Sequence, residues 1–358
     1  RLPPRPTLLP PSPASVVSMS LIYRRIGGMG VSKFDAYRIF EDKGNVEGQV
    51  VKTTIDELSP GEVIIRTAYS SVNYKDALAA TGAGKIIRSF PLIGGIDLAG
   101  SVVSSTAPRF AEGDAVVVMG YDLGVSHDGG YAELARVPAD WVLPIPEGLS
   151  AYEVMAIGTA GFTAAQSIVQ LEHNGLRPGQ GSVIVTGATG GVGSVAVELL
   201  AGLGYQVTAL TGKDDQHDHL RSLGATEVLS RHDLEIGTRP LEKSTWAGAV
   251  DVVGGDILAW LTRTLKYGGG IASSGLTAGT NLNTTVMPFI LRGVNLLGID
   301  SAACSLDRRR EIWKRLATDM KPTELFDVAQ KIDLSGLREA FSTLLDGEAR
   351  GRIVVQFA

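Results

Sequence analysis

The chain has 358 residues, enough for two domains of ordinary size, with 44% hydrophobic and 20% charged residues. No apolar run approaches the roughly 18–20 residues that span a bilayer, and the net charge of −5 argues against a nucleic-acid-binding protein, which would carry a basic face. The one cysteine, Cys304, can form neither an intramolecular disulfide nor a cysteine-rich zinc site. A reducing cytoplasm is the expected location.

Residues 1–32 differ in composition from the rest of the chain. They include the proline-rich stretch RLPPRPTLLPPSP and contain no acidic residue. This composition is compatible with a transit peptide. We instead predict a disordered tail or an artefactual upstream extension, since Met29-Gly30-Val31-Ser32 would make a natural start.

The next part of the chain, 33–157, has the pattern of short strands. Residues 61–66 (GEVIIR) and 114–118 (DAVVV) are examples, and glycine turns separate such segments. No long amphipathic helix interrupts them as far as Pro146. We predict a mainly β domain here.

Strands alternate with helices in the following part, 158–300. Strands are expected at 183–186, 206–210, 226–229, 249–253, 270–274 and 294–299, with helices in between. This alternation predicts βαβ units and the doubly wound parallel sheet of a Rossmann domain. Residues 301–358 end in another strand, 351–357, which is expected to return to the first domain.

A glycine-rich turn, TGATGGVGS at 186–194, directly follows the strand at 183–186. A strand, a glycine turn and a helix together present free backbone N–H groups at a positive helix end, which binds anions. Ala188 stands in the first glycine position of the G-x-G-x-x-G fingerprint, and no Lys-Ser/Thr pair follows as it would in a P-loop. The turn therefore predicts a dinucleotide site.

The end of the second strand indicates which dinucleotide. An NAD site usually has an acidic residue there to hold the ribose 2′-hydroxyl, whereas this chain has Thr211-Gly212-Lys213. A hydroxyl, an open backbone and a cation suit a 2′-phosphate. Asp214 and Asp215 follow immediately, and these two acidic residues favour NADH. The residues at the strand tip itself favour NADPH over NADH.

Several stretches resemble a known superfamily, the medium-chain dehydrogenases/reductases: 158–164, 186–193, 249–254 and 129–133. Within it, four stretches look like the acrylyl-CoA reductases, an NADPH-dependent, quinone-oxidoreductase-like branch: 73–78 (NYKDAL), 84–88 (GKIIR), 239–243 (RPLEK) and 284–292 (TTVMPFILR). The resemblance covers the chain from about residue 34 to its end.

This resemblance implies a fold, a cofactor and a set of contacts. The fold is α/β: a Rossmann domain plus a mainly β, GroES-like catalytic domain, with the active site in the cleft between them. The NADPH contacts carried over from the family are Tyr74, Thr189, Gly190, Gly191, Val192, Thr211, Gly212, Lys213, Arg231, Leu276, Ile290, Ser301 and Arg352. A homodimer through the edge strand near 294–301 is also expected.

The resemblance also bears on metals. Zinc-dependent members carry a cysteine and a Gly-His-Glu motif early in the chain, and the comparable region here, 94–100 (GGIDLAG), has neither cysteine nor histidine. No metal is therefore expected.

The implied activity is reduction of the carbon–carbon double bond of acryloyl-CoA to propionyl-CoA. The polar cluster Asn73, Tyr74 and Asp76 is the candidate catalytic group, and Arg88 is a candidate for a CoA phosphate. Two alternatives stay open: an NADPH:quinone or enone oxidoreductase on the same scaffold, and a non-catalytic NADPH-binding sensor.

Overall fold

A computed structural model describes residues 33–358, so the predictions for residues 1–32 lie outside the described residues. The first domain is built from two mainly antiparallel sheets and includes the short helix α2 (Tyr74–Thr81). A small sheet has the order β2-β1-β4, and a larger one has the order β15-β16-β3-β5-β6-β8 with β7 also paired to β3. Its strands up to residue 144 are β1 (Phe34–Asp42), β2 (Asn45–Thr53), β3 (Val63–Val72), β4 (Leu92–Ile93), β5 (Asp97–Ser105), β6 (Ala115–Met119), β7 (Leu134–Val137) and β8 (Leu143–Pro144).

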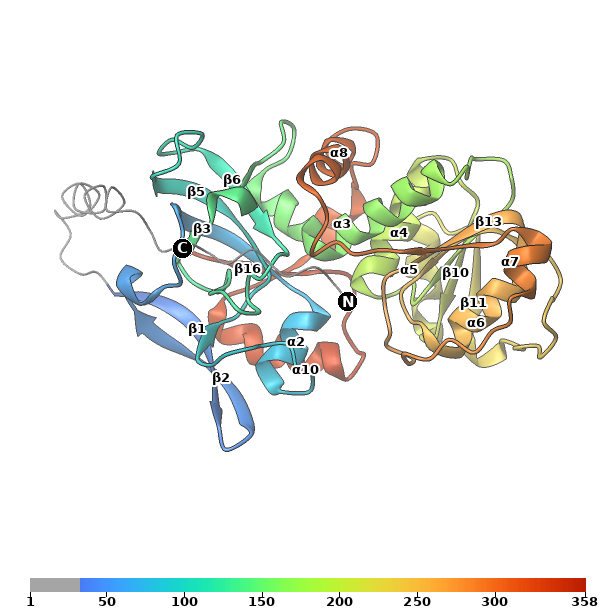
Figure 1. Cartoon of the computed structure of the whole chain (residues 1–358), viewed down its shortest axis with the longest axis horizontal. Helices are drawn as coiled ribbons and strands as arrows, with labels where there is room; N and C mark the ends of the chain where they lie inside the picture. Colours follow the sequence, from blue (N-terminus) through green and yellow to red (C-terminus); the bar gives the residue numbers. More distant parts are fainter. Residues whose placement is uncertain (1–32) are drawn as a thin grey trace, which may run out of the picture.

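The second domain has a six-stranded parallel sheet in the order β11-β10-β9-β12-β13-β14 (Figure 1). In chain order this is 3-2-1-4-5-6, the order of a dinucleotide-binding Rossmann sheet. The predicted Rossmann fold is confirmed. Its elements are β9 (Val183–Thr186), α4 (Gly191–Gly202), β10 (Val207–Thr211), α5 (His217–Ser222), β11 (Glu227–Ser230), β12 (Trp246–Asp251), α6 (Gly255–Thr264), β13 (Leu265–Ser273), α7 (Met287–Arg292) and β14 (Asn295–Gly298).

The end of the chain lies in the larger sheet of the catalytic domain. There β16 (Ile353–Gln356) pairs antiparallel with β3 and parallel with β15 (Gln330–Ile332). Three helices precede this strand, none of which the sequence pattern indicated. They are α8 (Leu306–Leu316), α9 (Glu324–Val328) and α10 (Leu337–Leu345).

The longest helix, α3 (Ala151–His173), was also not predicted. The predicted domain boundary after residue 157 falls inside it, at Gly158, whose backbone is non-helical (φ 52°, ψ −165°). A Cβ at Gly158 would lie 2.5 Å from Nη2 of Arg352, so only glycine admits the arginine at this kink. Gly158 thus lets the Arg352 side chain approach α3.

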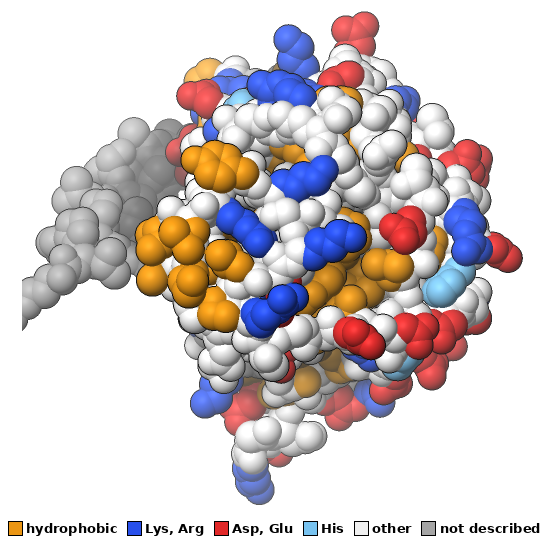
Figure 2. Space-filling view, turned by 90° about the vertical axis from the view of Figure 1, so that its right-hand side faces the viewer, with side chains coloured by type: hydrophobic (Ala, Val, Ile, Leu, Met, Phe, Trp, Pro, Cys, Tyr) orange, Lys and Arg blue, Asp and Glu red, His pale blue; other side chains and the backbone are white. Residues whose placement is uncertain are grey.

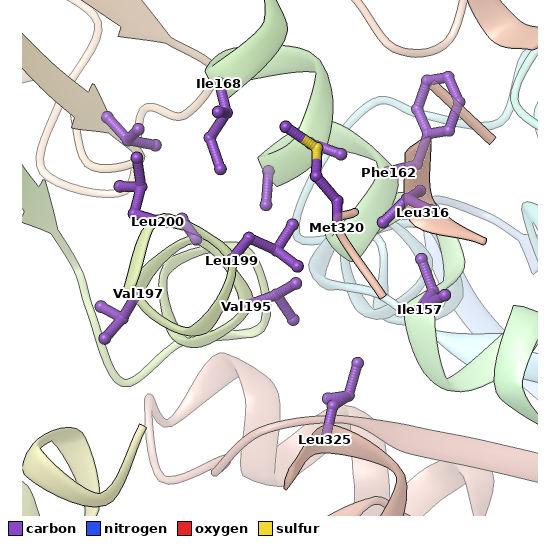
Figure 3. Close-up of a cluster of buried hydrophobic side chains, with 14 of the residues drawn as sticks. Ile157, Phe162, Ile168, Val195, Val197, Leu199, Leu200, Leu316, Met320 and Leu325 are labelled. Carbon is purple, nitrogen blue, oxygen red and sulfur yellow. The ribbon is translucent and has the colours of Figure 1, made fainter. Parts of the chain in front are cut away.

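One hydrophobic core runs through both domains because α3 lies between them (Figure 1). Ala99 and Val117 from the catalytic domain share this core with Val185 and Leu200 from the Rossmann domain. Figure 3 shows the part where Phe162 and Ile168 of α3 meet side chains of α4 and of the helical segment around Leu316. By length and composition α3 could span a membrane, but 89% of its most apolar window is buried inside the protein, which accounts for its apolar sequence.

A buried arginine joins the two domains beside Phe162 of α3. Arg309 of α8 is 1% exposed, and no carboxylate among residues 33–358 forms an ion pair with it. Its Nη1 donates to the Met119 carbonyl at 3.0 Å, and its Nη2 donates to the carbonyls of Ser301 and Ala302. The guanidinium also lies 4.5 Å from the centre of the Tyr121 ring, within cation–π range. Arg309 therefore ties the end of β6 to the chain that leaves β14.

Candidate active site and cofactor cleft

A cleft of about 340 Å³ lies between the two domains. Its walls come from the start of α2, from α3, from the glycine turn and from the segments that follow β13, β14 and α10. The lining residues include Asn73, Tyr74, Lys75, Ile96, Tyr121, Thr159, Thr163, Gly191, Val192, Ser301, Ala302, Gly351 and Arg352.

The glycine turn joins β9 to α4 on the Rossmann side of this cleft. Gly187 has a φ of 57°, and Gly190 caps α4 in an extended conformation. A Cβ at Gly193 would lie 2.3 Å from the Gly187 carbonyl oxygen, so glycine is required for the helix to pack against the turn. The free N–H groups at the start of α4 thus adjoin Gly191 and Val192, which line the cleft, as a pyrophosphate site requires.

The tip of β10 brings together the residues predicted for the adenosine end. The Thr211 and Thr189 hydroxyl groups are 3.3 Å apart, and the Thr211 hydroxyl accepts a hydrogen bond from the backbone N–H of Lys213. A Cβ at Gly212 would lie 3.1 Å from Nη2 of Arg231, so the guanidinium rests on the open backbone there. A hydroxyl and two cations therefore surround this strand end.

The floor of the cleft is organised by a buried carboxylate, Asp97, which is 0% exposed. It accepts hydrogen bonds from the Ser71 hydroxyl, from Nδ2 of Asn73 at 2.8 Å, and from the backbone N–H and hydroxyl of Thr159 at 2.9 and 2.5 Å. Its donors come from β3, the start of α2 and α3. The carboxylate thus fixes two cleft-lining side chains, those of Asn73 and Thr159.

Arg352, one of the predicted cofactor contacts, lies beside Asp97 and lines the cleft. Its Nε donates to the Ala156 carbonyl and its Nη1 to the Val72 carbonyl, both at 3.1 Å. Nη2 has no partner among the described residues, and a Cβ at Gly191 would lie 3.2 Å from Nη1. Burial lowers the pKa of Arg352, against the attraction of the Asp97 and Asp76 carboxylates. This buried cation next to the start of α4 suits an anionic cofactor group.

The three predicted catalytic residues separate into two groups. Asn73 and Tyr74 line the cleft, and Oδ1 of Asn73 is buried with no partner among residues 33–358. Asp76 does not line the cleft. It accepts hydrogen bonds from the backbone N–H groups of Asn73 and Ile96. The bond from Asn73 is part of a capping box at the N-terminus of α2.

Several predicted ligand contacts are not among the cleft-lining residues: Thr189, Gly190, Thr211, Gly212, Lys213 and Arg231 near the end of β10, and Leu276, Ile290 and Arg88 elsewhere. Leu276 and Ile290 are 59% and 72% exposed. Arg88 is paired with Asp122 at 3.5 Å on the surface. Their assigned roles stay predictions, whereas Ser301 lines the cleft and its hydroxyl accepts from that of Thr163 at 2.8 Å.

Some residues that shape the cleft were not predicted from the sequence. Thr159 and Asp97 lie in the stretches 158–164 and 94–100, but no local pattern assigns a role to either residue. Lys75 and Asp76 are adjacent in sequence, but their side chains do not pair. Asp76 is buried, whereas Lys75 lines the cleft and forms no ion pair with any of the described residues. Neither periodicity nor local spacing indicates such contacts between distant segments.

The side chains at the cleft floor do not fit a zinc ion. Catalytic zinc takes histidine, cysteine or carboxylate ligands, whereas the floor presents Asn73, Ile96 and Thr159. The Asp97 oxygens are occupied by hydrogen bonds. No group of three or more His, Cys, Asp or Glu within residues 33–358 could hold a metal.

Comparison with known proteins identifies the family. Residues 59–147 match the model of the alcohol dehydrogenase GroES-like domain, and residues 191–318 match that of a zinc-binding dehydrogenase. Over 90% of its length the chain is 49% identical to the putative quinone oxidoreductase YhfP of Bacillus subtilis, covering 98% of that protein. Over 88% of its length it is 46% identical to the acrylyl-CoA reductase AcuI of Ruegeria pomeroyi, covering 96% of it. The chain belongs to the medium-chain dehydrogenase/reductase superfamily, in the branch that includes the acrylyl-CoA reductases.

Solved structures of this branch agree with the fold and the cofactor. The Salmonella enterica yhdH oxidoreductase in complex with NADP has 46% identity and a TM-score of 0.88, covering 90% of this chain and 100% of that one. Bacillus subtilis yhfP with NAD bound has 48% identity and a TM-score of 0.89, covering 91% and 100%. The protein is an NADPH-dependent oxidoreductase of this superfamily, and the cleft is the candidate site for its nicotinamide cofactor.

The protonation of Asp76 leads to a prediction about stability. Burial, and then the Asp97 carboxylate, raise the pKa of Asp76 from 3.8 to about 7. Because the folded state binds this proton more tightly than the unfolded state, the group stabilises the fold below pH 4, and this contribution is lost as the pH rises to 7. When the pKa values of the folded and unfolded states differ by one, the contribution is about 1.36 kcal/mol.

We therefore expect the difference in unfolding free energy between the wild type and Asp76→Asn to fall between pH 4 and pH 7. Denaturant titrations at closely spaced pH values measure it. Subtracting the unfolding free energy of the variant at each pH removes the contribution of surface carboxylates such as Asp319, which changes with pH in the opposite direction. The pKa of Asp319 is lowered by Arg315. A difference that does not change with pH would contradict the proposed titration.

Proposed function

We propose that the protein reduces the activated carbon–carbon double bond of acryloyl-CoA to propionyl-CoA with NADPH. The observation that carries the proposal is the cleft itself, which is lined by the glycine turn, by Arg352 and by polar side chains that include no zinc ligand. The 46% identity to the acrylyl-CoA reductase AcuI supports the substrate class. An alkene conjugated to a thioester accepts a hydride without a metal to polarise it, so we also propose a metal-free enzyme.

NADPH supplies the hydride, which adds to the β-carbon of the substrate while negative charge collects on the thioester oxygen and a proton reaches the α-carbon. The protein must hold the reacting carbons about 3–3.5 Å apart. It must also place donors where the enolate oxygen develops. Asn73 and Thr159, both held by hydrogen bonds to Asp97, are suited to the first task.

Lys75 is suited to the second task. It is half-buried in the cleft wall and occupies the first turn of α2, where a cation is unfavourable unless an anion is present. No carboxylate pairs with it within residues 33–358. We propose that Lys75 stabilises the enolate oxygen, while the neighbouring Tyr74 hydroxyl contacts the nicotinamide or relays the proton.

Two other functions remain as alternatives. The 49% identity to a putative quinone oxidoreductase favours a quinone or enone as acceptor. A non-catalytic NADPH sensor would bind the cofactor without turnover. For the main proposal, Arg88 is kept as the predicted contact of a CoA phosphate, and location in a reducing cytoplasm is supported by the single, buried cysteine Cys304.

The substrate proposal predicts rapid loss of NADPH absorbance with acryloyl-CoA. Crotonyl-CoA and a simple quinone, each at the same concentration, are the comparison acceptors, and the rate is expected to persist in the presence of a chelator. Faster turnover of the quinone would move the function to the first alternative. Tight NADPH binding with no turnover of any acceptor would favour the sensor.

The role of Lys75 predicts a loss of turnover in Lys75→Met. Removing one donor to a developing oxyanion costs about 10²–10³ in kcat. The matched control is Lys85→Met, on the exposed segment after α2, which is expected to leave kcat unchanged. Acryloyl-N-acetylcysteamine, a thioester without phosphates, tests the assignment: Lys75→Met must lower kcat for it as well. A loss confined to the CoA ester would show that Lys75 binds CoA phosphates instead.

We also propose a homodimer through β14. This strand ends the Rossmann sheet, with no strand on its outer side among the described residues, and Leu296 on it is exposed. Figure 2 shows hydrophobic side chains gathered on one side of this end of the molecule. Exposed apolar residues on and near α7 are Val286, Met287, Ile290 and Leu291. An uncovered edge strand beside apolar surface is typical of an interface.

The dimer predicts that sedimentation equilibrium at micromolar concentration gives a mass twice that of the chain. Leu296→Arg places a charge in the proposed interface and is expected to shift the protein toward monomer. Val50→Arg, at a similarly exposed site on β2, is the control. A wild-type monomer, or an equal response of both variants, would overturn the proposal.

A further inference from the structure

The two acidic residues after β10 raise the question of how the protein prefers NADPH. An acid near this strand end usually holds the ribose 2′-hydroxyl of NAD, and its charge repels the 2′-phosphate of NADP. Asp214 and Asp215 lie directly after Lys213. Solved relatives of similar identity hold NADP in one case and NAD in another, so relatedness alone does not set the preference.

In the structure Asp215 is engaged by a residue from the far end of the chain. Its Oδ2 accepts a hydrogen bond from Nη2 of Arg350 at 2.9 Å and another from the side chain of Gln216. Both partners of the ion pair are well exposed, 66% and 63%, so the guanidinium remains open to a ligand. Asp214 is itself 3.6 Å from Nε2 of His217.

Arg350 belongs to a segment that crosses from the catalytic domain. It lies between α10 and β16, and the preceding residue, Ala349, accepts a hydrogen bond from Nζ of Lys213 at 2.8 Å. Burial, and next the nearby charge of Arg350, lower the pKa of Lys213, while the carboxylates of Asp215 and Glu348 act in the opposite direction. Such crowding of cations is unfavourable unless an anion is bound between them.

Three cations gather around the end of β10, where two carboxylates, Asp214 and Asp215, also lie, and cations are what a dianionic 2′-phosphate requires. Arg231 lies on Gly212, Lys213 follows it, and Arg350 approaches from the other domain. Asp215 is paired with Arg350, whereas Asp214 lies near His217. No residue with a free acidic side chain occupies the strand tip itself.

We propose that Arg350 determines the selectivity of this protein for NADPH over NADH, by neutralising Asp215 and by adding a third cation for the 2′-phosphate. The inference rests on the NADPH dependence of the enzyme and not on the identity of the reduced substrate. It also gives the adenosine end of the cofactor a link to the reaction site, because Gly351 and Arg352, which follow Arg350 directly, line the cleft.

The test is direct titration of the enzyme with NADPH and with NADH, followed by nicotinamide fluorescence, in the wild type and in Arg350→Gln, Asp215→Asn and the double variant. We expect Arg350→Gln to weaken NADPH binding about tenfold, the effect of losing one charged hydrogen bond, and to leave NADH binding within about twofold. Asp215→Asn in the Arg350→Gln background is expected to recover at least part of the loss, because it removes the unpaired carboxylate.

Arg338→Gln is the matched control, since Arg338 forms an equally exposed ion pair with Glu47 away from the cleft lining. It must leave both affinities unchanged. The proposal is overturned if the wild type binds the two cofactors equally, if Arg350→Gln weakens both to the same extent, or if the double variant recovers nothing. Because the measurement needs no acceptor, its failure is distinguishable from failure of the acryloyl-CoA proposal.

Discussion

The hydrogen bonds accepted by the Asp97 carboxylate are the constraint on which the reaction site depends. A buried carboxylate is costly unless its lone pairs are satisfied, and here four donors from three separate elements satisfy them. One of those elements, α3, is the helix whose apolar side chains join the cores of the two domains. Fixing Asp97 therefore fixes the start of α2 and the kink of α3 in one geometry, and with them two walls of the cleft.

The buried groups around Asp97 also explain two local features that look unfavourable in isolation, the kink at Gly158 and the burial of Asp76. Gly158 breaks the helical geometry of α3 so that Arg352 can approach Asp97, since a Cβ there would lie 3.0 Å from Oδ2 of Asp97 and 2.5 Å from Nη2 of Arg352. Asp76 sits close enough to Asp97 that its own ionisation is opposed. A broken helix and two neighbouring carboxylates are tolerated where the surrounding structure holds the groups involved in place. Here β3, β16 and α3 all supply groups to the cluster, so it is held from several sides.

The sequence predicted the cofactor side of the molecule better than the catalytic side, for a physical reason. The strands and the glycine turn of the Rossmann domain are set by local periodicity and by short-range backbone geometry, and they appear within a few residues of the expected positions. The cleft floor is set by contacts between β3, β5, α3 and β16, which are distant in sequence. No local pattern distinguishes Asp97, which organises the floor, from Asp128, a carboxylate that only caps loops through Ser59 and Ile93.

Leu276 and Ile290 differ from the transferred residues that line the cleft because their side chains are exposed. Both lie in stretches on the Rossmann side where exposed apolar side chains are common, and neither lines the cleft. Arg352 and Ser301, transferred in the same way, do line it, because buried contacts fix them: Arg352 against the Val72 carbonyl and Ser301 against Thr163. Residues held by the packing between the two domains keep their place in the cleft. The positions of exposed side chains depend on the ligand or partner subunit that contacts them. Their roles therefore follow from the assembled, ligand-bound enzyme rather than from the chain alone.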